Sequence, residues 1–179
     1  AELIRFIRVY PNHEDVIYAE YLLGLCYYEQ IVDEKKDLQS IINAKKTFKS
    51  LISKYPDTEF ATDATFKINL INEILAAKEM YLARYYVDRK KWISAINRFR
   101  VVVDDYETTI YVEEATHRLV EIYYHLGLEE ESKKYTNLLG YNYLSSEWYK
   151  KSYVIFNKNY KIDYQKKEKS KVIKIFDKL

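Results

Sequence analysis

The sequence has few of the residues that turns, disulfide bonds and membrane spans require. Its 179 residues include three glycines, two prolines and one cysteine. Strand-rich folds need many turn residues and phosphate-binding loops need glycines, so a β-sandwich, a dinucleotide-binding domain or a P-loop enzyme is not expected. No uncharged stretch approaches the roughly 18 apolar residues of a membrane-spanning helix. With 48% hydrophobic and 31% charged residues, the composition indicates one folded domain or an array of small repeats.

The residues that most often carry catalysis or bind metals are also scarce. Cys26 cannot form an internal disulfide or a multi-cysteine zinc site, and its apolar surroundings, YLLGLCYY, predict a small buried residue. His117 and His125 are eight residues apart, beyond the one-turn spacing of a helical metal pair, and His13 lies in a polar turn. No nucleophile motif is recognisable. We therefore expect no enzyme activity, no metal and no cofactor.

Charge is unevenly distributed along the chain. Residues 1–149 carry 19 Lys and Arg against 24 Asp and Glu, whereas residues 150–179 carry 10 against 3. Lysines interleaved with aromatic residues can bind single-stranded nucleic acid or an anionic membrane surface, and they could equally dock on the acidic part of the chain. Because the segment has no arginine and no RNA-binding motif, we favour a solvated extension and expect no nucleic-acid partner.

A repeat runs through the chain, marked by Tyr10, Tyr55 and Tyr106. An alanine follows each tyrosine by nine residues, apolar residues precede it by three, four and seven, and another alanine precedes two of them by eleven. In chain order the shared positions are Leu3, Phe6, Ile7, Ala19, Ala44, Phe48, Leu51, Ile52, Ala64, Ala95, Phe99, Val102, Val103 and Ala115. A weaker fourth copy places Tyr143 in register, with Ser132 in an alanine position. Repetition at this length is typical of solenoid proteins.

The spacing of three and four residues puts these positions on one face of a helix. Pro11 and Pro56 directly follow two of the tyrosines and would end a helix there, and Thr58 and Thr109 can cap the helix that follows. Each unit is therefore helix, turn, helix. We predict an all-α, tetratricopeptide-like superhelix of antiparallel helix pairs, with Phe48, Leu51, Phe99 and Val102 buried.

The repeat departs from the simple 34-residue tetratricopeptide unit, because the tyrosines are 45, 51 and 37 residues apart. The extra residues are expected in a polar loop over 29–40 and in one long helix over 59–87. Residues 1–10 are expected to be the second helix of a unit whose first helix is absent. Since the chain starts at Ala1 without a methionine or a signal-like segment, it is expected to be a trimmed chain or a fragment.

The local cluster that most favours binding is ARYYVDRKKWISAINR, residues 83–98. Tyr85 and Tyr86 point about 100° apart on a helix, so both are not expected in the core. Tyrosine, tryptophan and arginine dominate interface hot spots, and all three occur here with Arg89 and Arg98. The alternative is that Trp92 packs between two helices while the arginines are solvated. We favour the interface.

Five segments resemble the BamD family, the tetratricopeptide lipoproteins of the bacterial outer-membrane β-barrel assembly machinery. They are residues 5–13, 18–25, 44–64, 83–109 and 140–153, the last being similar to an extension in alphaproteobacterial members. The resemblance implies a five-repeat periplasmic scaffold at the outer membrane, anchored by a lipidated N-terminal cysteine. It also implies that the chain is N-terminally truncated and lacks that anchor. Residues 1–140 would then hold the second half of repeat 2 through repeat 5, and residues 141–179 a helical, basic extension.

The resemblance also implies partners and binding residues. In the family, the N-terminal repeats receive unfolded barrel precursors, a site expected to be incomplete here, and the C-terminal repeats hold a POTRA domain of the barrel core subunit. Accessory lipoproteins of the machinery are further implied partners. The family's POTRA-contacting arginine corresponds to Arg98, and Tyr85, Tyr86 and Arg89 match its neighbours. A different tetratricopeptide adaptor, binding a peptide in its concave groove, remains the alternative.

Overall fold

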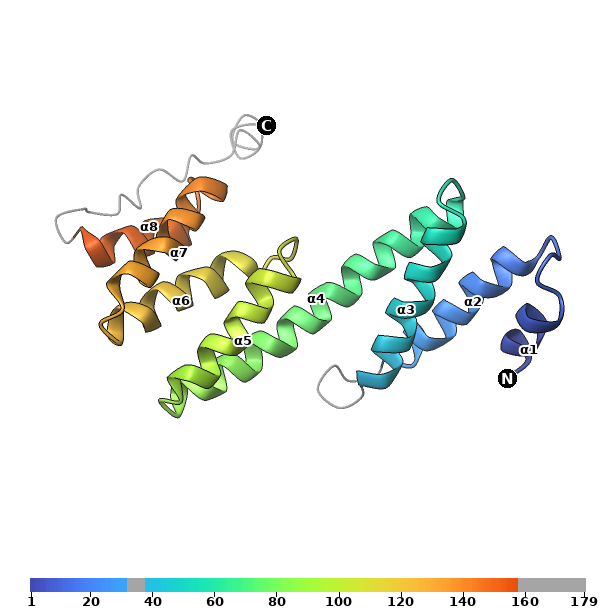
Figure 1. Cartoon of the computed structure of the whole chain (residues 1–179), viewed down its shortest axis with the longest axis horizontal. Helices are drawn as coiled ribbons and strands as arrows, with labels where there is room; N and C mark the ends of the chain where they lie inside the picture. The colour runs from blue at the N-terminus through green and yellow to red at the C-terminus, as the bar shows by residue number, and fades with distance from the viewer. Residues whose placement is uncertain (32–37, 158–179) are drawn as a thin grey trace, which may run out of the picture. The chain divides into compact units, whose positions relative to one another are not determined.

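The computed structural model describes residues 1–31 and 38–157, and there it contains eight helices and no strand (Figure 1). The helices are α1 (Glu2–Val9), α2 (Val16–Glu29), α3 (Leu38–Lys54), α4 (Glu59–Asp88), α5 (Trp92–Asp105), α6 (Val112–His125), α7 (Glu129–Asn142) and α8 (Glu147–Phe156). The prediction of an all-α, tetratricopeptide-like fold is confirmed. No helix in this described part is both long enough and apolar enough to cross a membrane.

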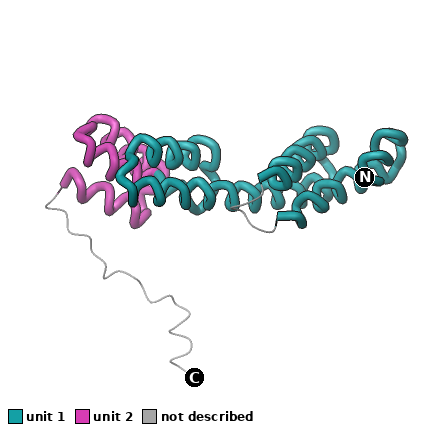
Figure 2. The backbone as a smooth tube through the Cα atoms, turned by 90° about the horizontal axis from the view of Figure 1, so that it is seen from below, with its two compact units in different colours: residues 1–115 teal, residues 116–179 magenta. Residues whose placement is uncertain are grey.

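The chain forms two compact units, residues 1–115 and residues 116–179 (Figure 2). The division falls within α6, so the first turn of that helix belongs to the first unit. In the first unit α2 pairs with α3 and α4 pairs with α5, each pair antiparallel, while α3 also packs on α4 (Figure 1). The long helix predicted over residues 59–87 is confirmed, because α4 is 30 residues long.

Several apolar repeat positions lie in the core of the first unit. Phe48 and Leu51 on α3 are fully buried against Ala64 and Ile71 on α4. On α5 the equivalent residues, Phe99 and Val102, are also fully buried. The alanines four residues before Phe48 and Phe99, which are Ala44 and Ala95, are fully buried too. The predicted burial of Phe48, Leu51, Phe99 and Val102 is therefore confirmed, whereas α1, which carries the first copy, has no buried residue.

All four tyrosines of the repeat end a helix in the same way. The backbone amides of Tyr10, Tyr55, Tyr106 and Tyr143 each donate to the carbonyl oxygen four residues earlier, at 2.8–3.2 Å. Each tyrosine carbonyl then accepts the amide three residues later, at 2.9–3.3 Å; the donors are His13, Thr58, Thr109 and Ser146. The weaker fourth copy thus has the same helix ending as the other three.

The fourth copy carries serine where the others carry alanine. Ser132 precedes Tyr143 by eleven residues and is fully buried, as Ala44 and Ala95 are in their copies. Its hydroxyl donates to the Val120 carbonyl at 2.8 Å, so no buried donor is left unsatisfied. A small side chain is what this position requires, because two helices approach closely there.

The turns within two helix pairs share one backbone motif. Lys90, between α4 and α5, has φ 56°, and Gly127, between α6 and α7, has φ 77°. In both turns the next residue's amide reaches back to the carbonyl five residues earlier, from Lys91 to Tyr86 and from Leu128 to Tyr123, at 2.9 Å each. This is a Schellman-type helix ending, in which glycine is the usual left-handed residue.

Adding a glycine to the first turn and removing the glycine from the second should change the free energy of unfolding in opposite directions. A left-handed conformation costs a lysine roughly 1–2 kcal/mol, whereas glycine adopts it freely but loses more chain entropy on folding. We therefore expect Lys90→Gly to raise the free energy of unfolding by about 0.5 kcal/mol and Gly127→Ala to lower it by about 1 kcal/mol. Urea denaturation measures both, and a less stable Lys90→Gly protein would contradict this reading of the turn.

Two predictions about α2 and the following loop need correction. Cys26 is exposed, so the prediction that it is a buried residue is wrong. Gly24 is the residue of α2 that faces the core: a Cβ atom added there would lie 2.7 Å from Phe48 Cδ1. Cys26 follows two residues later and is therefore turned about 200° away around the helix. The loop predicted over residues 29–40 is shorter, because α2 includes Glu29 and α3 begins at Leu38; residues 32–37 lie outside the described part.

The second unit includes the start of the C-terminal extension. α8 packs on α7, and Gly140 makes room for the Tyr149 ring, which a Cβ there would meet at 2.8 Å. Ser146 caps α8 by accepting the Trp148 amide at 3.1 Å. The expectation of a solvated, lysine-rich tail falls largely on residues 158–179, outside the described residues.

Candidate partner-binding site

The four residues predicted to bind a partner come together where α4 turns into α5. Tyr85 and Tyr86 are in the last turn of α4, and Arg89 is the residue that ends it. The left-handed turn at Lys90 sends α5 back along α4. Arg98, in the second turn of α5, therefore lies on the same part of the first unit as the two tyrosines.

Tyr85 and Arg89 form a stacked pair at one end of this surface. The Arg89 guanidinium carbon is 4.4 Å from the centre of the Tyr85 ring, a cation–π contact. The Tyr85 ring in turn meets the Tyr86 ring edge-on, with 5.6 Å between their centres. Three of the four residues are thus in continuous contact, and Tyr85 remains 42% exposed.

Arg98 and Tyr86 share a surface hollow of about 180 Å³. The other residues that line it are Ser94, Asn97 and Val101, all on α5. The hollow is thus lined by hydrogen-bond donors: the Arg98 guanidinium, the Asn97 amide, and the hydroxyl groups of Tyr86 and Ser94. Such donors can bind a carboxylate. Sequence reasoning missed Ser94 and Asn97, although their spacing from Arg98 and Val101 puts them on one side of α5.

Most of the hydrogen-bonding capacity of Arg98 is unused. Its Nη1 donates to Glu79 Oε2 at 3.1 Å, and its side chain is 42% exposed. Its remaining N–H groups have no partner among the described residues, although a guanidinium carries five such donors. Arg98 can therefore donate hydrogen bonds to a second carboxylate while it keeps its bond to Glu79.

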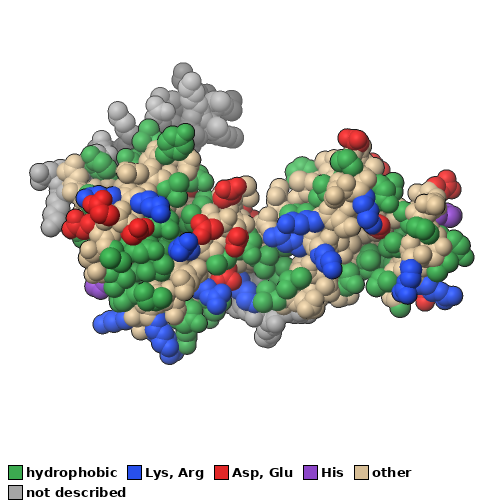
Figure 3. Space-filling model, in the orientation of Figure 1, with side chains coloured by type: hydrophobic (Ala, Val, Ile, Leu, Met, Phe, Trp, Pro, Cys, Tyr) green, Lys and Arg blue, Asp and Glu red, His purple; other side chains and the backbone are tan. Residues whose placement is uncertain are grey.

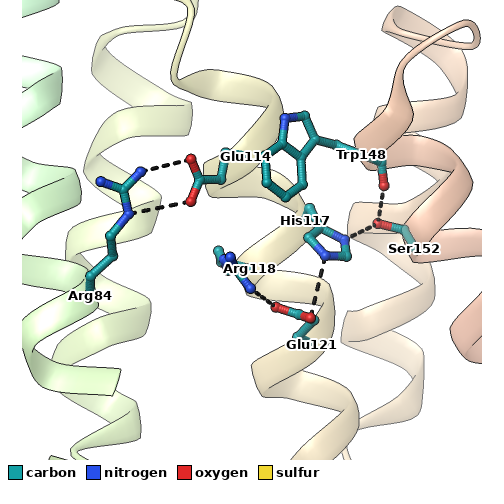
Figure 4. Close-up of polar contacts among 7 residues, drawn as sticks. All are labelled: Arg84, Glu114, His117, Arg118, Glu121, Trp148 and Ser152. Carbon is teal, nitrogen blue, oxygen red and sulfur yellow. Dashed lines mark hydrogen bonds and ion pairs between the residues drawn. The ribbon is translucent and has the colours of Figure 1, made fainter. Parts of the chain in front are cut away.

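The residues at this site carry charges of both signs: Arg89 and Arg98 are basic, and Glu79, which pairs with Arg98, is acidic. Basic and acidic side chains are also interspersed among apolar ones on the face of the molecule in Figure 3. Nearby, Arg84 on α4 makes a two-point ion pair with Glu114, at 2.7 and 3.3 Å (Figure 4). Binding here would depend on individual groups such as Arg98 rather than on a broad basic or acidic patch.

A second concave surface lies between α1, α2 and α3. It is a groove of about 390 Å³ lined by Ile4, Ile7, Glu20, Leu23, Tyr27, Asn43, Lys46, Thr47, Ser50 and Lys54. Glu20 is buried within it and pairs with Lys54 at 2.6 Å between Oε1 and Nζ. The sequence pattern did not predict this groove. The one indication of it is Glu20, a charged residue inside the apolar segment of residues 18–25.

The second unit contains a buried polar cluster that joins α8 to α6 (Figure 4). His117 is 3% exposed, and its Nδ1 is 2.8 Å from Ser152 Oγ. Ser152 donates to the Trp148 carbonyl at 3.0 Å, so its oxygen is left to accept from the histidine. The His117 ring also packs on the Trp148 ring, with 5.2 Å between centres. His117 therefore anchors the extension helix.

Glu121 lies at the edge of this cluster. Its two oxygens are 3.4 Å from His117 Nε2 and 2.7 Å from Arg118 Nη1. Burial raises the pKa of the Glu121 carboxyl, but hydrogen bonds from His117 and Arg118 and their charges outweigh this and lower the pKa to about 2. The Glu121 carboxyl group thus stays ionised to a lower pH in the folded chain than in the unfolded chain.

This difference predicts how Glu121 affects acid stability. Ionised Glu121 should stabilise the fold above pH 4.5, its ordinary pKa, and the contribution should disappear as the pH falls to about 2. Glu121→Gln should therefore be less stable than the unchanged chain at pH 6, with the gap closing towards pH 2. Urea unfolding followed by Trp148 fluorescence in a Trp92→Phe background measures the gap. A gap independent of pH would contradict the assignment.

The fold defines a class of protein, a tetratricopeptide-like array of antiparallel helix pairs, and the surface at the turn from α4 to α5 is its candidate binding site. The described residues contain no cluster of three His, Cys, Asp or Glu side chains that could hold a metal. The chain belongs to the YfiO family, described as an outer membrane lipoprotein, which matches residues 1–139. The resemblance seen in the sequence is thereby confirmed.

Named relatives agree with this family. The chain is 46% identical over 155 residues to the outer membrane protein assembly factor BamD of Rickettsia prowazekii, covering 87% of this chain and 61% of that protein. It is 41% identical over 155 residues to BamD of Caulobacter vibrioides, covering 87% and 51%. For BamD of Neisseria meningitidis serogroup A the values are 31% over 137 residues, 71% and 51%. The chain thus spans about half to three fifths of these relatives.

Proposed function

We propose that this chain is a non-enzymatic scaffold of the outer-membrane β-barrel assembly machinery, working at the periplasmic face of the outer membrane. Its relatives are named as assembly factors and its family as an outer membrane lipoprotein, which supports the setting. In this proposal residues 1–140 are the repeats and residues 141–179 the extension. The full-length protein would be lipid-anchored and would also meet the accessory lipoproteins of the machinery.

The principal activity we propose is docking of the barrel core subunit's POTRA domain on Arg98, Tyr85, Tyr86 and Arg89. The observation that carries this is the unused hydrogen-bonding capacity of Arg98 at the mouth of a polar hollow. An exposed arginine of this kind is a binding group, because a carboxylate on the partner would form charge-assisted bonds with N–H groups that the chain itself does not use. Tyr85 and Tyr86, whose rings meet edge-on beside it, supply rigid apolar contact area.

The concave groove between α1, α2 and α3 would form part of a site that receives unfolded barrel precursors, a site expected to be incomplete in this chain. Its apolar side chains and its lysines can contact an extended peptide, and α2 and α3 hold it in one unit. The same groove would serve a peptide-binding tetratricopeptide adaptor, which is the alternative function. The two surfaces share no residue, so their occupants can be tested separately.

A calorimetric titration tests the docking proposal. Purified POTRA domain added to the folded chain should bind saturably, and a peptide copied from a barrel strand should not compete with it, because it would occupy the groove. A folded chain that binds the peptide but not the POTRA domain would contradict docking and support the peptide-binding adaptor.

A further inference from the structure

Glu79 lies behind the proposed docking arginine and contacts it from another helix. It belongs to α4, two turns before Tyr86, whereas Arg98 belongs to α5. The Glu79 side chain is 18% exposed and its Oε2 accepts from Arg98 Nη1 at 3.1 Å. The carboxylate is thus the more buried partner and the guanidinium the more exposed one.

Glu79 is the less mobile member of the pair. Its side chain is 18% exposed, whereas that of Arg98 is 42% exposed, so the surrounding residues leave the carboxylate less room to move than the guanidinium. Glu79 also acts on the Tyr106 hydroxyl: burial raises the pKa of that hydroxyl, and the charges of Glu79 and Asp105 raise it further. We therefore expect Arg98 to adapt to Glu79 rather than the reverse.

The contact with Glu79 occupies only one end of the guanidinium. A carboxylate meets arginine best through two parallel N–H bonds, and Nε and Nη2 form such a pair on the edge away from Nη1. Because Nη1 is bonded to Glu79, the Arg98 side chain is restricted to the few rotamers that keep this bond. This restriction lowers the entropy that a partner must remove when it binds.

We infer that Glu79 is a positioning residue: it holds Arg98 so that the Nε and Nη2 edge is presented at the hollow lined by Ser94 and Asn97, ready for one carboxylate side chain. The inference rests on the proposed docking function and deepens it. The opposite role is that Glu79 competes with the partner's carboxylate for Arg98. The two roles give opposite results when the charge of Glu79 is removed.

The first arm of the test needs no partner. The Nη1 signal of Arg98 in a ¹⁵N–¹H spectrum at low temperature should be resolved and slowed in exchange in the unchanged chain, because Nη1 donates to Glu79. In Glu79→Gln it should move to the position of solvated arginines, while the backbone amide signals of α5 stay in place. The matched control is Glu114→Gln, which removes a carboxylate that is 16% exposed from another interhelical pair, that with Arg84, and should leave the Arg98 signal unchanged. An Arg98 signal unaltered by Glu79→Gln would overturn the inference.

The second arm uses the POTRA domain. Glu79→Gln should weaken its binding about 2- to 10-fold, the range expected for one side chain that must be immobilised on binding. Glu114→Gln should bind like the unchanged chain. Tighter binding by Glu79→Gln would show competition and overturn the inference. If the POTRA domain binds none of the proteins, the docking function fails, and the Arg98 signal still decides whether Glu79 positions the arginine.

Discussion

Replacing Phe99 with alanine should lower the free energy of unfolding by about 3–5 kcal/mol, the cost of emptying a well-packed aromatic position. Phe99 is fully buried on α5 and occupies the repeat position that Phe48 occupies on α3. Phe48→Ala should cost about as much. Both losses follow from one structural statement, that in these two helix pairs the phenylalanine fills the space between neighbouring helices.

Phe66→Ala is the matched control for these two variants. Phe66 is on α4 but is 64% exposed, so its removal should cost under about 1 kcal/mol. Urea unfolding of the three variants, followed by circular dichroism at 222 nm, provides the comparison. A loss below about 1 kcal/mol for Phe48→Ala or Phe99→Ala would show that the repeat register does not describe the core.

Arg98→Glu should weaken binding of the POTRA domain by about 2–5 kcal/mol while leaving the fold intact. The change removes the open guanidinium edge at the hollow and puts a negative charge there, beside Glu79 and opposite the partner's carboxylate. A partner carboxylate that loses its arginine is left desolvated, which accounts for much of the loss. The fold should survive because the Arg98 side chain is 42% exposed and makes a single ion pair.

The parts of the fold that could be predicted are those that recur. The same spacing occurs in two helices, in Ala44 and Phe48 and again in Ala95 and Phe99. A wrong assignment of the buried face in one helix would therefore have conflicted with the assignment in the other. The length of α4 followed from a continuous apolar face between Thr58, which caps it by accepting the Ala61 amide at 3.2 Å, and the polar turn after it.

Where the pattern was ambiguous, the prediction failed. α2 is apolar around most of its circumference, so its sequence does not show which side meets the core; Gly24 does, and Cys26 does not. The left-handed turn at Lys90 could not be predicted either, because lysine is not a residue that favours that conformation.

The candidate site was predictable only in its most conspicuous residues. Tyr85, Tyr86, Arg89 and Arg98 were selected from their residue types and from the family resemblance. The contact between Glu79 and Arg98 joins two helices across 19 residues, and no local spacing in the sequence indicates such a pair. The hollow likewise depends on how α5 lies against α4, which only the folded chain defines.

The central claim, that this surface docks the POTRA domain through Arg98, is tested most directly by calorimetric titration of that domain with the unchanged chain, Arg98→Glu and Arg100→Glu. Arg100 is the matched control, since it is an exposed arginine on the same helix, is turned about 200° from Arg98 and makes only a 3.7 Å contact with Asp104. We expect Arg98→Glu to lose at least about 30-fold in affinity, equivalent to about 2 kcal/mol, and Arg100→Glu to bind like the unchanged chain. Equal affinities for all three proteins, with equal helix content, would contradict the claim.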